Sequence, residues 1–103
     1  MKRMATMAEA YSVLIAPHNP NGPLSTLASS HVCASIPNFS VRVIRLIPCV
    51  PWRDRVIDHP IADMVYDGML HLSDRPGLGV DLVEEEMEAH PGITENAPVN
   101  FYI

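Results

Sequence analysis

Several residue types are scarce in this sequence, and each shortage excludes a class of protein. Two cysteines among 103 residues, Cys33 and Cys49, form no disulfide framework, so we expect both thiols to be reduced and buried. Only seven Lys and Arg residues occur, they are scattered, and the net charge of -5 argues against a nucleic-acid partner. No apolar run approaches the ~20 residues of a membrane span. Glu9 interrupts the segment after Lys2, so no secretory leader is recognised. We therefore expect a cytoplasmic protein with neither nucleic acid nor membrane as a partner.

Phosphate-binding glycine patterns, internal repeats and low-complexity segments are also lacking. The glycines of residues 76–79, P-G-L-G, belong to no G-x-G-x-x-G or Walker pattern. They predict a tight turn instead.

The most informative stretch, residues 12–38, predicts a strand, a rigid turn and a helix. Residues 13–16 form an unbroken apolar run, which is typical of a strand covered on both faces. Three prolines and a glycine between residues 17 and 23 restrict the backbone of the turn that carries His18. Asn21 or Gly22 can cap a helix that begins at Pro23, where a missing N–H costs nothing.

The predicted helix ends before Pro37, and one face of it has the spacing of a buried stripe. The residues of that face are Leu24, Leu27, Ala28, His31, Val32 and Ser35. Residues 39–47 are rich in β-branched side chains and predict a second strand, parallel to the first and joined to it by the helix.

His18 is the candidate catalytic residue of this unit. Side chains at the carboxyl end of a strand in a strand–helix–strand unit lie where chemistry is performed. The alternative is that a histidine in a proline-rich turn only caps a helix or bonds a neighbouring carbonyl.

The remaining segments are interpreted as having structural roles. Met4, Met7, Ala8 and Tyr11 form an apolar helical stripe that predicts core packing. Asp67-Gly68 between two apolar runs predicts a β-hairpin within residues 64–72.

After the second predicted strand, regular periodicity fades. Residues 53–55, R-D-R, are interpreted as a solvated charge cluster, and Pro60 blocks any long helix. Residues 83–89 carry four glutamates and predict a short solvated helix that ends at His90-Pro91. Residues 94–103 are expected to be a loose tail.

Residues 16–31, A-P-H-N-P-N-G-P-L-S-T-L-A-S-S-H, resemble a motif of the mandelate racemase subgroup of the enolase superfamily. The motif covers the end of the seventh barrel strand and the following helix, and it is most similar to that of sugar-acid dehydratases of the galactonate dehydratase type. Similar segments follow in order on both sides: residues 4–11, 51–56, 67–68 and 76–80.

This resemblance implies an α/β fold. The expected architecture is the C-terminal portion of a TIM-type (β/α) barrel, in the order helix, strand, helix, strand, plus an irregular tail with a short hairpin. Residues 1–50 would form the last two strands of the barrel, and residues 51–103 the C-terminal tail of the same domain. Because a complete barrel takes about 250 residues, the chain is expected to be a piece of a longer enzyme.

The chemistry implied by the resemblance is removal of a proton next to a carboxylate, followed by loss of water. His18 corresponds to the general base of the family, and Asn19 and Gly22 are expected to bind substrate. Full-length family members use magnesium, but their carboxylate ligands and general acid lie earlier in the barrel than this chain begins. We therefore expect no metal site in the fragment alone. His31 and Cys33 are expected to pack, because residues two apart on a helix point to different sides.

Residue 43 departs from the family pattern. The eighth strand of the family carries a glutamate at the matching position, whereas residues 41–49, V-R-V-I-R-L-I-P-C, contain no acid. Similarity resumes at Pro51. A short compensated frameshift or a sequencing error is our hypothesis for this stretch, and rereading the DNA tests it.

Two functions follow as hypotheses. In the first, the chain is the C-terminal piece of a metal-dependent sugar-acid dehydratase and is inactive in isolation. In the second, it is a non-catalytic remnant or small interaction module that associates with an intact barrel protein. Unpaired strand edges predict self-association and a poorly soluble or loosely folded polypeptide. The sugar acid itself is not specified, since galactonate is only the default of the family.

Overall fold

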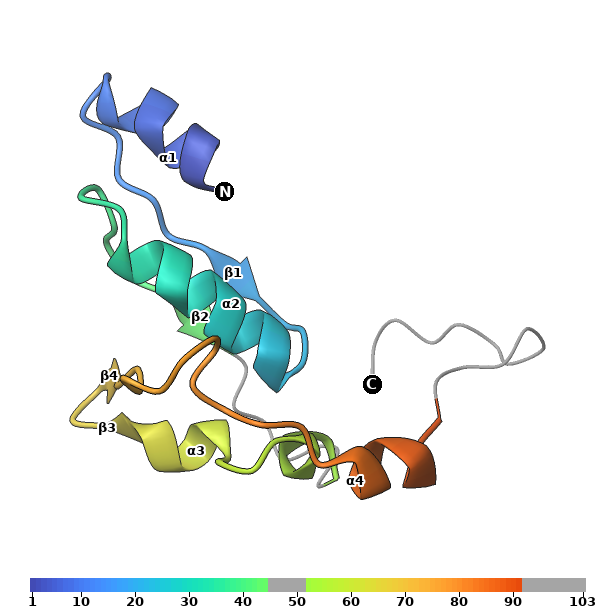
Figure 1. The fold of residues 1–103 in the computed structure, drawn as a ribbon. Helices are drawn as coiled ribbons and strands as arrows, with labels where there is room; N and C mark the ends of the chain where they lie inside the picture. Colours follow the sequence, from blue (N-terminus) through green and yellow to red (C-terminus); the bar gives the residue numbers. More distant parts are fainter. Residues whose placement is uncertain (45–51, 92–103) are drawn as a thin grey trace.

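The structure, a computed structural model, describes residues 1–44 and 52–91 (Figure 1). Its elements in chain order are α1 (Lys2–Glu9), β1 (His18–Asn19), α2 (Pro23–Ala34), β2 (Val43–Ile44), the 3₁₀ helix η1 (Arg53–Val56), α3 (Ile61–Met64), β3 (Val65–Tyr66), β4 (Met69–Leu70) and α4 (Glu84–Ala89).

The strands β1 and β2 pair in parallel and are joined by α2, which confirms the predicted strand–helix–strand order. The predicted position of the first strand is wrong, because β1 lies at His18–Asn19, within the predicted turn, and of the run at 13–16 only Ile15 makes a bridge within the described residues. His18 is the register partner of Val43, and a single bridge upstream joins Ile15 to Phe39. Between these two contacts, the first segment advances by three residues, from 15 to 18, and the segment paired with it advances by four, from 39 to 43. The extra residue makes a bulge, which explains why the regular ladder is shorter than the apolar runs predicted.

The prediction that residues 13–16 are covered on both faces is wrong for this chain. Val13 is 52% exposed and Leu14 is 63% exposed. Within residues 1–44 and 52–91, the sheet that contains β1 has only two strands, so nothing pairs with the outer edge of β1.

Helix α2 begins and ends where the sequence predicts. Gly22 is its N-cap, Pro23 is its first residue, and Ala34 ends it ahead of Pro37. The predicted buried face is wrong in part, because Ala28 and Ser35 are exposed. Leu27 is buried as predicted, and the other buried residues of the helix were not predicted: Pro23, Thr26, Ser30 and Cys33.

Polar residues can occupy this face because their hydrogen bonds are made locally. The Thr26 hydroxyl accepts a hydrogen bond from the Asn19 amide at 3.0 Å, and the Ser30 hydroxyl donates to the Thr26 carbonyl at 2.8 Å. Buried polar groups with partners cost little. Hydrophobic spacing alone therefore predicted a face of α2 that is rotated about the helix axis relative to the face that is buried.

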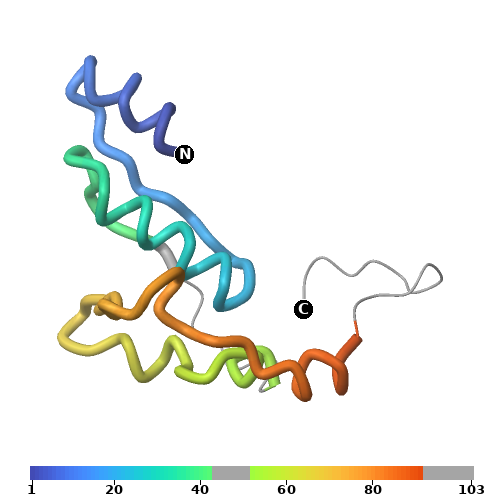
Figure 2. Tube along the Cα trace, viewed as in Figure 1, coloured from blue at the N-terminus to red at the C-terminus, as the bar shows by residue number. Residues whose placement is uncertain are grey.

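The core lies between α2 and the tail, and Figure 2 shows the tail running alongside the helix. Leu27 of α2 packs with three tail residues, Ile57, Ile61 and Met64, all of them at most 4% exposed. The same helix contacts β1 on its other side through Asn19 and Thr26. Helix α2 is thus the central layer between the two-stranded sheet and the tail.

The tail contains the turns and the short helix that its sequence predicts. The hairpin is confirmed: β3 and β4 pair antiparallel around Asp67 and Gly68, which both have positive φ, as a two-residue turn of the I′ type requires. The turn at residues 76–79 is closed by a hydrogen bond from the Gly79 N–H to the Pro76 carbonyl at 3.2 Å. The short helix before His90 is present as α4.

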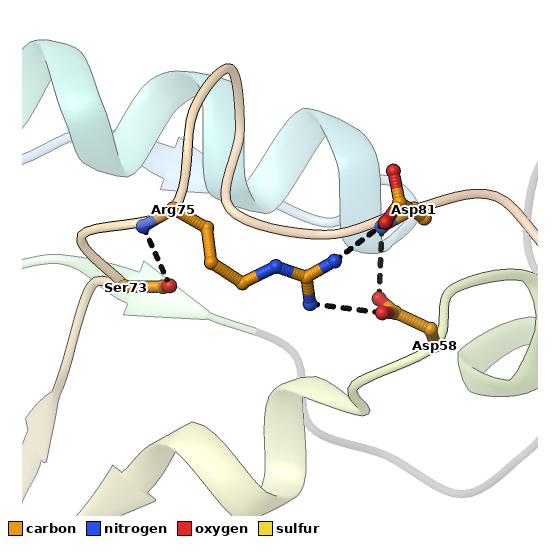
Figure 3. Close-up of polar contacts among 4 residues, drawn as sticks. All are labelled: Asp58, Ser73, Arg75 and Asp81. Carbon is orange, nitrogen blue, oxygen red and sulfur yellow. Dashed lines mark hydrogen bonds and ion pairs between the residues drawn. The ribbon is translucent and has the colours of Figure 1, made fainter.

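Two tail segments far apart in sequence are joined by a cluster of charges (Figure 3). Arg75 pairs with Asp58 at 2.9 Å and with Asp81 at 2.5 Å, and Asp58 also accepts the Asp81 N–H at 2.8 Å. These hydrogen bonds and the Arg75 guanidinium hold the pKa of Asp58 below its ordinary value. An antiparallel bridge between Ile57 and Leu82 continues the contact.

The predicted packing of the methionine stripe of α1 is wrong for this chain. Met4 is 69% exposed, Met7 is 72% exposed and Tyr11 is 82% exposed, whereas only Ala5 of the helix is buried. The helix is held through its backbone, because the Asn38 amide donates to the Ala5 carbonyl at 2.9 Å.

Some predictions fall on residues outside the described ranges. They concern Cys49, most of the acid-free stretch at 45–49, and the tail at 94–103. Cys33 is buried, as expected. Among the helices of the described ranges, none is long and apolar enough to cross a membrane.

Candidate functional site

The candidate site is the turn that joins β1 to the amino end of α2. His18 lies on β1, and its imidazole is exposed, whereas the next residue, Asn19, is 4% exposed. This alternation is the period of a strand, which turns successive side chains to opposite faces. The His18 imidazole makes no hydrogen bond to any residue in the described part of the chain. The exposed side chain is therefore accessible to a ligand.

The side chain of Asn19 holds the turn in place through three hydrogen bonds. Its side-chain Nδ2 donates to Thr26 Oγ1 at 3.0 Å, and its Oδ1 accepts the Asn21 backbone N–H at 3.2 Å and the Ser25 hydroxyl at 3.3 Å. Each such bond contributes about 1 kcal/mol. Together they fix the start of α2 relative to β1. That Asn19 contacts substrate stays a prediction.

Gly22 ends the turn with a φ of -68°, a value open to any residue. A Cβ at this position would lie 3.7 Å from Arg53 Nε, an ordinary contact. The backbone conformation and the available space therefore do not require a glycine here. The expected role of Gly22 in substrate binding likewise stays a prediction.

Arg53 is a component of the turn that the sequence reasoning missed. It was interpreted as part of a solvated cluster, but its side chain is half-buried and its Nη2 donates to the Pro20 carbonyl at 2.9 Å. Within the same cluster, Arg55 pairs with Glu86 of α4 at 3.1 Å. The only signal in the sequence was the position of the cluster in the segment at 51–56, which resembles a family segment near the site.

The described residues do not form a metal site. No group of three or more His, Cys, Asp or Glu side chains converges within residues 1–44 and 52–91. Magnesium needs near-octahedral oxygen ligation, so the residues present do not fit it. His31 lies 3.5 Å from the Leu78 carbonyl, and Cys33 is buried among other side chains, in agreement with the packing role expected for both.

The chain belongs to the enolase C-terminal domain-like family. The model of this family matches residues 1–86, which include the whole of the turn that carries His18. This domain is the barrel portion of its proteins, so the described elements are the C-terminal part of a (β/α) barrel.

Curated relatives are sugar-acid dehydratases. The D-mannonate dehydratase of Caulobacter vibrioides is 34% identical over 97% of this chain, and the D-xylonate dehydratase of Haloferax volcanii is 32% identical over 86% of it. A D-galactonate dehydratase family member of Streptomyces bingchenggensis is 36% identical over 82% of the chain. These alignments cover 24%, 21% and 20% of the relatives. The chain thus spans less than a quarter of their length.

Solved structures agree with the family. A mandelate racemase/muconate lactonizing enzyme-like protein from Rubrobacter xylanophilus superposes with a TM-score of 0.78 at 34% identity, over 91% of this chain and 24% of that one. A structure from Burkholderia xenovorans bound to magnesium and fumarate gives a TM-score of 0.74 at 33% identity, over 86% of this chain and 21% of that one. The magnesium belongs to that protein.

Proposed function

We propose that this chain is the C-terminal part of a metal-dependent sugar-acid dehydratase of the galactonate type, and that it acts in the cytoplasm. The observation that carries the proposal is the placement of His18. Its imidazole is exposed and makes no hydrogen bond within the described structure, and it lies on the short strand β1 directly before a turn held by Asn19 and Arg53. Relatives that align with this segment are dehydratases of sugar acids.

In the proposed reaction, His18 removes the proton on the carbon next to the substrate carboxylate. The electron pair of that C–H bond moves into the carboxylate to give an enediolate. When the enediolate collapses, the neighbouring carbon loses its hydroxyl, which leaves as water after taking a proton from a general acid. A histidine suits the first step because its ordinary pKa lies close to neutral pH.

The described residues supply the base and the turn but no metal ligands, so no step is assigned to a metal in this chain. The amino end of α2 faces the turn, and its unpaired N–H groups favour an anionic substrate. The general acid and the magnesium ligands would come from the rest of a barrel. We therefore expect the isolated chain to be inactive.

A chimera tests the proposal. The matching segment of the D-mannonate dehydratase of Caulobacter vibrioides is replaced by this chain, and dehydration of mannonate is measured with magnesium present. A second chimera carries Val43→Glu, since the family resemblance places a glutamate at the register partner of His18. We expect at least one of the two chimeras to be active, and His18→Asn to lower its turnover by about 10²–10⁴-fold.

The matched control is His59→Asn, because His59 is exposed in the tail. It should leave turnover unchanged. If both chimeras fold and neither dehydrates mannonate, the dehydratase proposal is wrong. If an active chimera tolerates His18→Asn, His18 is not the base.

A second candidate function is association with a barrel protein, and the exposed edge of β1 favours it. Val13 and Leu14 precede that edge, and both are more than half exposed. We infer that this edge pairs with another polypeptide, either an intact barrel or a second copy of the chain. Size-exclusion chromatography of the chain, alone over a range of concentrations and mixed with the mannonate dehydratase, tests this. A monomer at all concentrations that also elutes apart from the dehydratase contradicts it.

A further inference from the structure

A cavity of about 510 Å³ lies between the carboxyl half of α2, the segment that leads into β2, and the β3–β4 hairpin. Its volume falls in the range of small-molecule sites, roughly 300–1,000 Å³. No residue of the His18 turn lines it, so it is separate from the candidate catalytic site.

The polar part of the lining comes from α2 and the segment before β2. Ser30 and Cys33 are 6% and 5% exposed. The Arg42 guanidinium donates to the Ser30 hydroxyl at 2.7 Å and to the Ser29 hydroxyl, both of which are neutral acceptors. Its Nε is buried and has no partner in the described structure.

Arg42 is therefore a partly buried positive charge that has no carboxylate partner among residues 1–44 and 52–91. The ion pairs of residues 1–44 and 52–91 involve Arg55, Arg75 and His90, and none reaches Arg42. Burial lowers the pKa of Arg42, and the neighbouring Cys33 thiol offsets part of this effect. Charges removed from water are normally paired, and the described residues around this cavity supply no carboxylate for Arg42.

The remaining walls are apolar. Phe39 and Val41 on one side and Met69 on the other are partly exposed at 37%, 57% and 58%, and Leu70 and Leu72 lie deeper. A single cation beside apolar walls complements a molecule with one negative charge and an apolar body. A multiply charged anion would leave charge unpaired.

We propose that this cavity binds a small monocarboxylate with an apolar tail. The carboxylate pairs with the Arg42 guanidinium, whose fork geometry suits two parallel hydrogen bonds. The tail lies against the hairpin, over Leu70 and Leu72.

Titration of the ¹⁵N-labelled 103-residue chain with octanoate tests the proposal, with octan-1-ol and octylamine as probes of equal tail length. We expect octanoate to shift the Cys33, Arg42 and Leu70 amides in a saturable way. Its affinity should exceed that of octan-1-ol by at least 10-fold, and octylamine should bind no better than the alcohol.

Two variants and a control keep the result interpretable. Arg42→Gln should reduce octanoate to the affinity of the alcohol. Met69→Trp fills the rim from an exposed position, so it spares the fold and should weaken all three probes. Arg3→Gln removes an equal charge from exposed α1 and should change nothing. Equal affinity for octanoate and octan-1-ol, an unaffected Arg42→Gln variant, or no saturable shift with octanoate would each overturn the proposal.

Discussion

The two sides of the β1–α2 unit carry equally apolar residues but differ in what lies against them. Towards the tail, Leu27 is 1% exposed and Ile57 is 2% exposed. On the other side, Leu14 is 63% exposed and Met7 is 72% exposed. Burial of apolar surface contributes about 25 cal/mol per Å², so Leu27 and Ile57 have gained this stabilisation within the described structure, whereas Leu14 and Met7 have gained little of it. The difference shows that the neighbour, rather than the residue type, decides which apolar side chains form the core.

Leucine truncation on the two sides should give the largest contrast. Leu27→Ala removes a side chain from the core and should cost about 2–5 kcal/mol of the free energy of unfolding. Leu14→Ala is the matched control and should change it by less than about 0.5 kcal/mol, because Leu14 is exposed. Urea denaturation followed by circular dichroism measures both. Similar losses of unfolding free energy for Leu27→Ala and Leu14→Ala would contradict the difference between the two sides.

Asparagine substitution in the turn should have an intermediate effect. Asn19→Ala removes the acceptor of the Asn21 N–H and the amide that donates to the Thr26 hydroxyl, and it should cost about 1–3 kcal/mol. Asn21→Ala removes an exposed side chain and serves as the control. The same urea experiment applies, with amide exchange at Asn21 and Gly22 as a local readout. An Asn19→Ala variant as stable as Asn21→Ala would contradict the role given to the buried amide.

Asp58→Asn should have a smaller effect that depends on pH. The folded-state pKa of Asp58 is lowered, so its ionised form adds stability above the unfolded pKa, and this stability is lost as pH falls through the folded pKa. The urea midpoint of the variant should lie below that of the parent at pH 7. This gap should close as the pH falls below about 4.

Asp74→Asn is the control for Asp58→Asn, because Asp74 is exposed and has no ion pair within the described residues. Its midpoint should follow that of the parent at every pH. A gap for Asp58→Asn that persists unchanged in acid would rule out the carboxylate as its cause.

Polar substitution on the exposed side should have the smallest effect on stability but should change solubility. We expect the parent polypeptide to be poorly soluble or loosely folded. The segments expected to be loosely folded are α1 and the edge of β1. Met4→Gln with Met7→Gln should raise the saturation concentration and leave the urea midpoint unchanged, because both side chains are exposed. A sharp cooperative melt and dispersed amide signals from α1 in the parent would show that this expectation is wrong.

Local signals in the sequence predicted much of the fold. Pro23 and the cap before it placed the start of α2, and Asp67-Gly68 placed the hairpin, because turns and caps are determined by nearby residues. The buried face of α2 was not predictable in full. Thr26 and Ser30 are buried through hydrogen bonds that hydrophobic spacing does not reveal.

For the candidate site, the sequence predicted that His18 lies shortly before α2, but it placed this residue in a turn rather than on β1 and did not predict its surroundings. The contact of Arg53 with Pro20 joins residues 33 apart, and it depends on how the tail packs against α2. A charged triplet in a sequence gives no indication of which of its members is turned inwards. The family resemblance covered the same segment, but it assigned no partner to the arginine.

Residue-resolved hydrogen exchange, with and without the rest of a barrel, tests most directly whether this chain is a barrel segment with one uncovered side. The 103-residue chain is measured alone and then mixed with the Caulobacter vibrioides mannonate dehydratase from which the matching C-terminal segment has been removed. We predict that the amides of Met7, Val13 and Leu14 exchange fast in the chain alone, because the hydrogen bonds of Met7 and Val13 lie within the exposed α1 segment, which is expected to be loosely held. The same amides should exchange slowly in the mixture, while Leu27 is protected in both. Unchanged fast exchange at all three residues in the mixture, or full protection of them in the chain alone, would contradict the account.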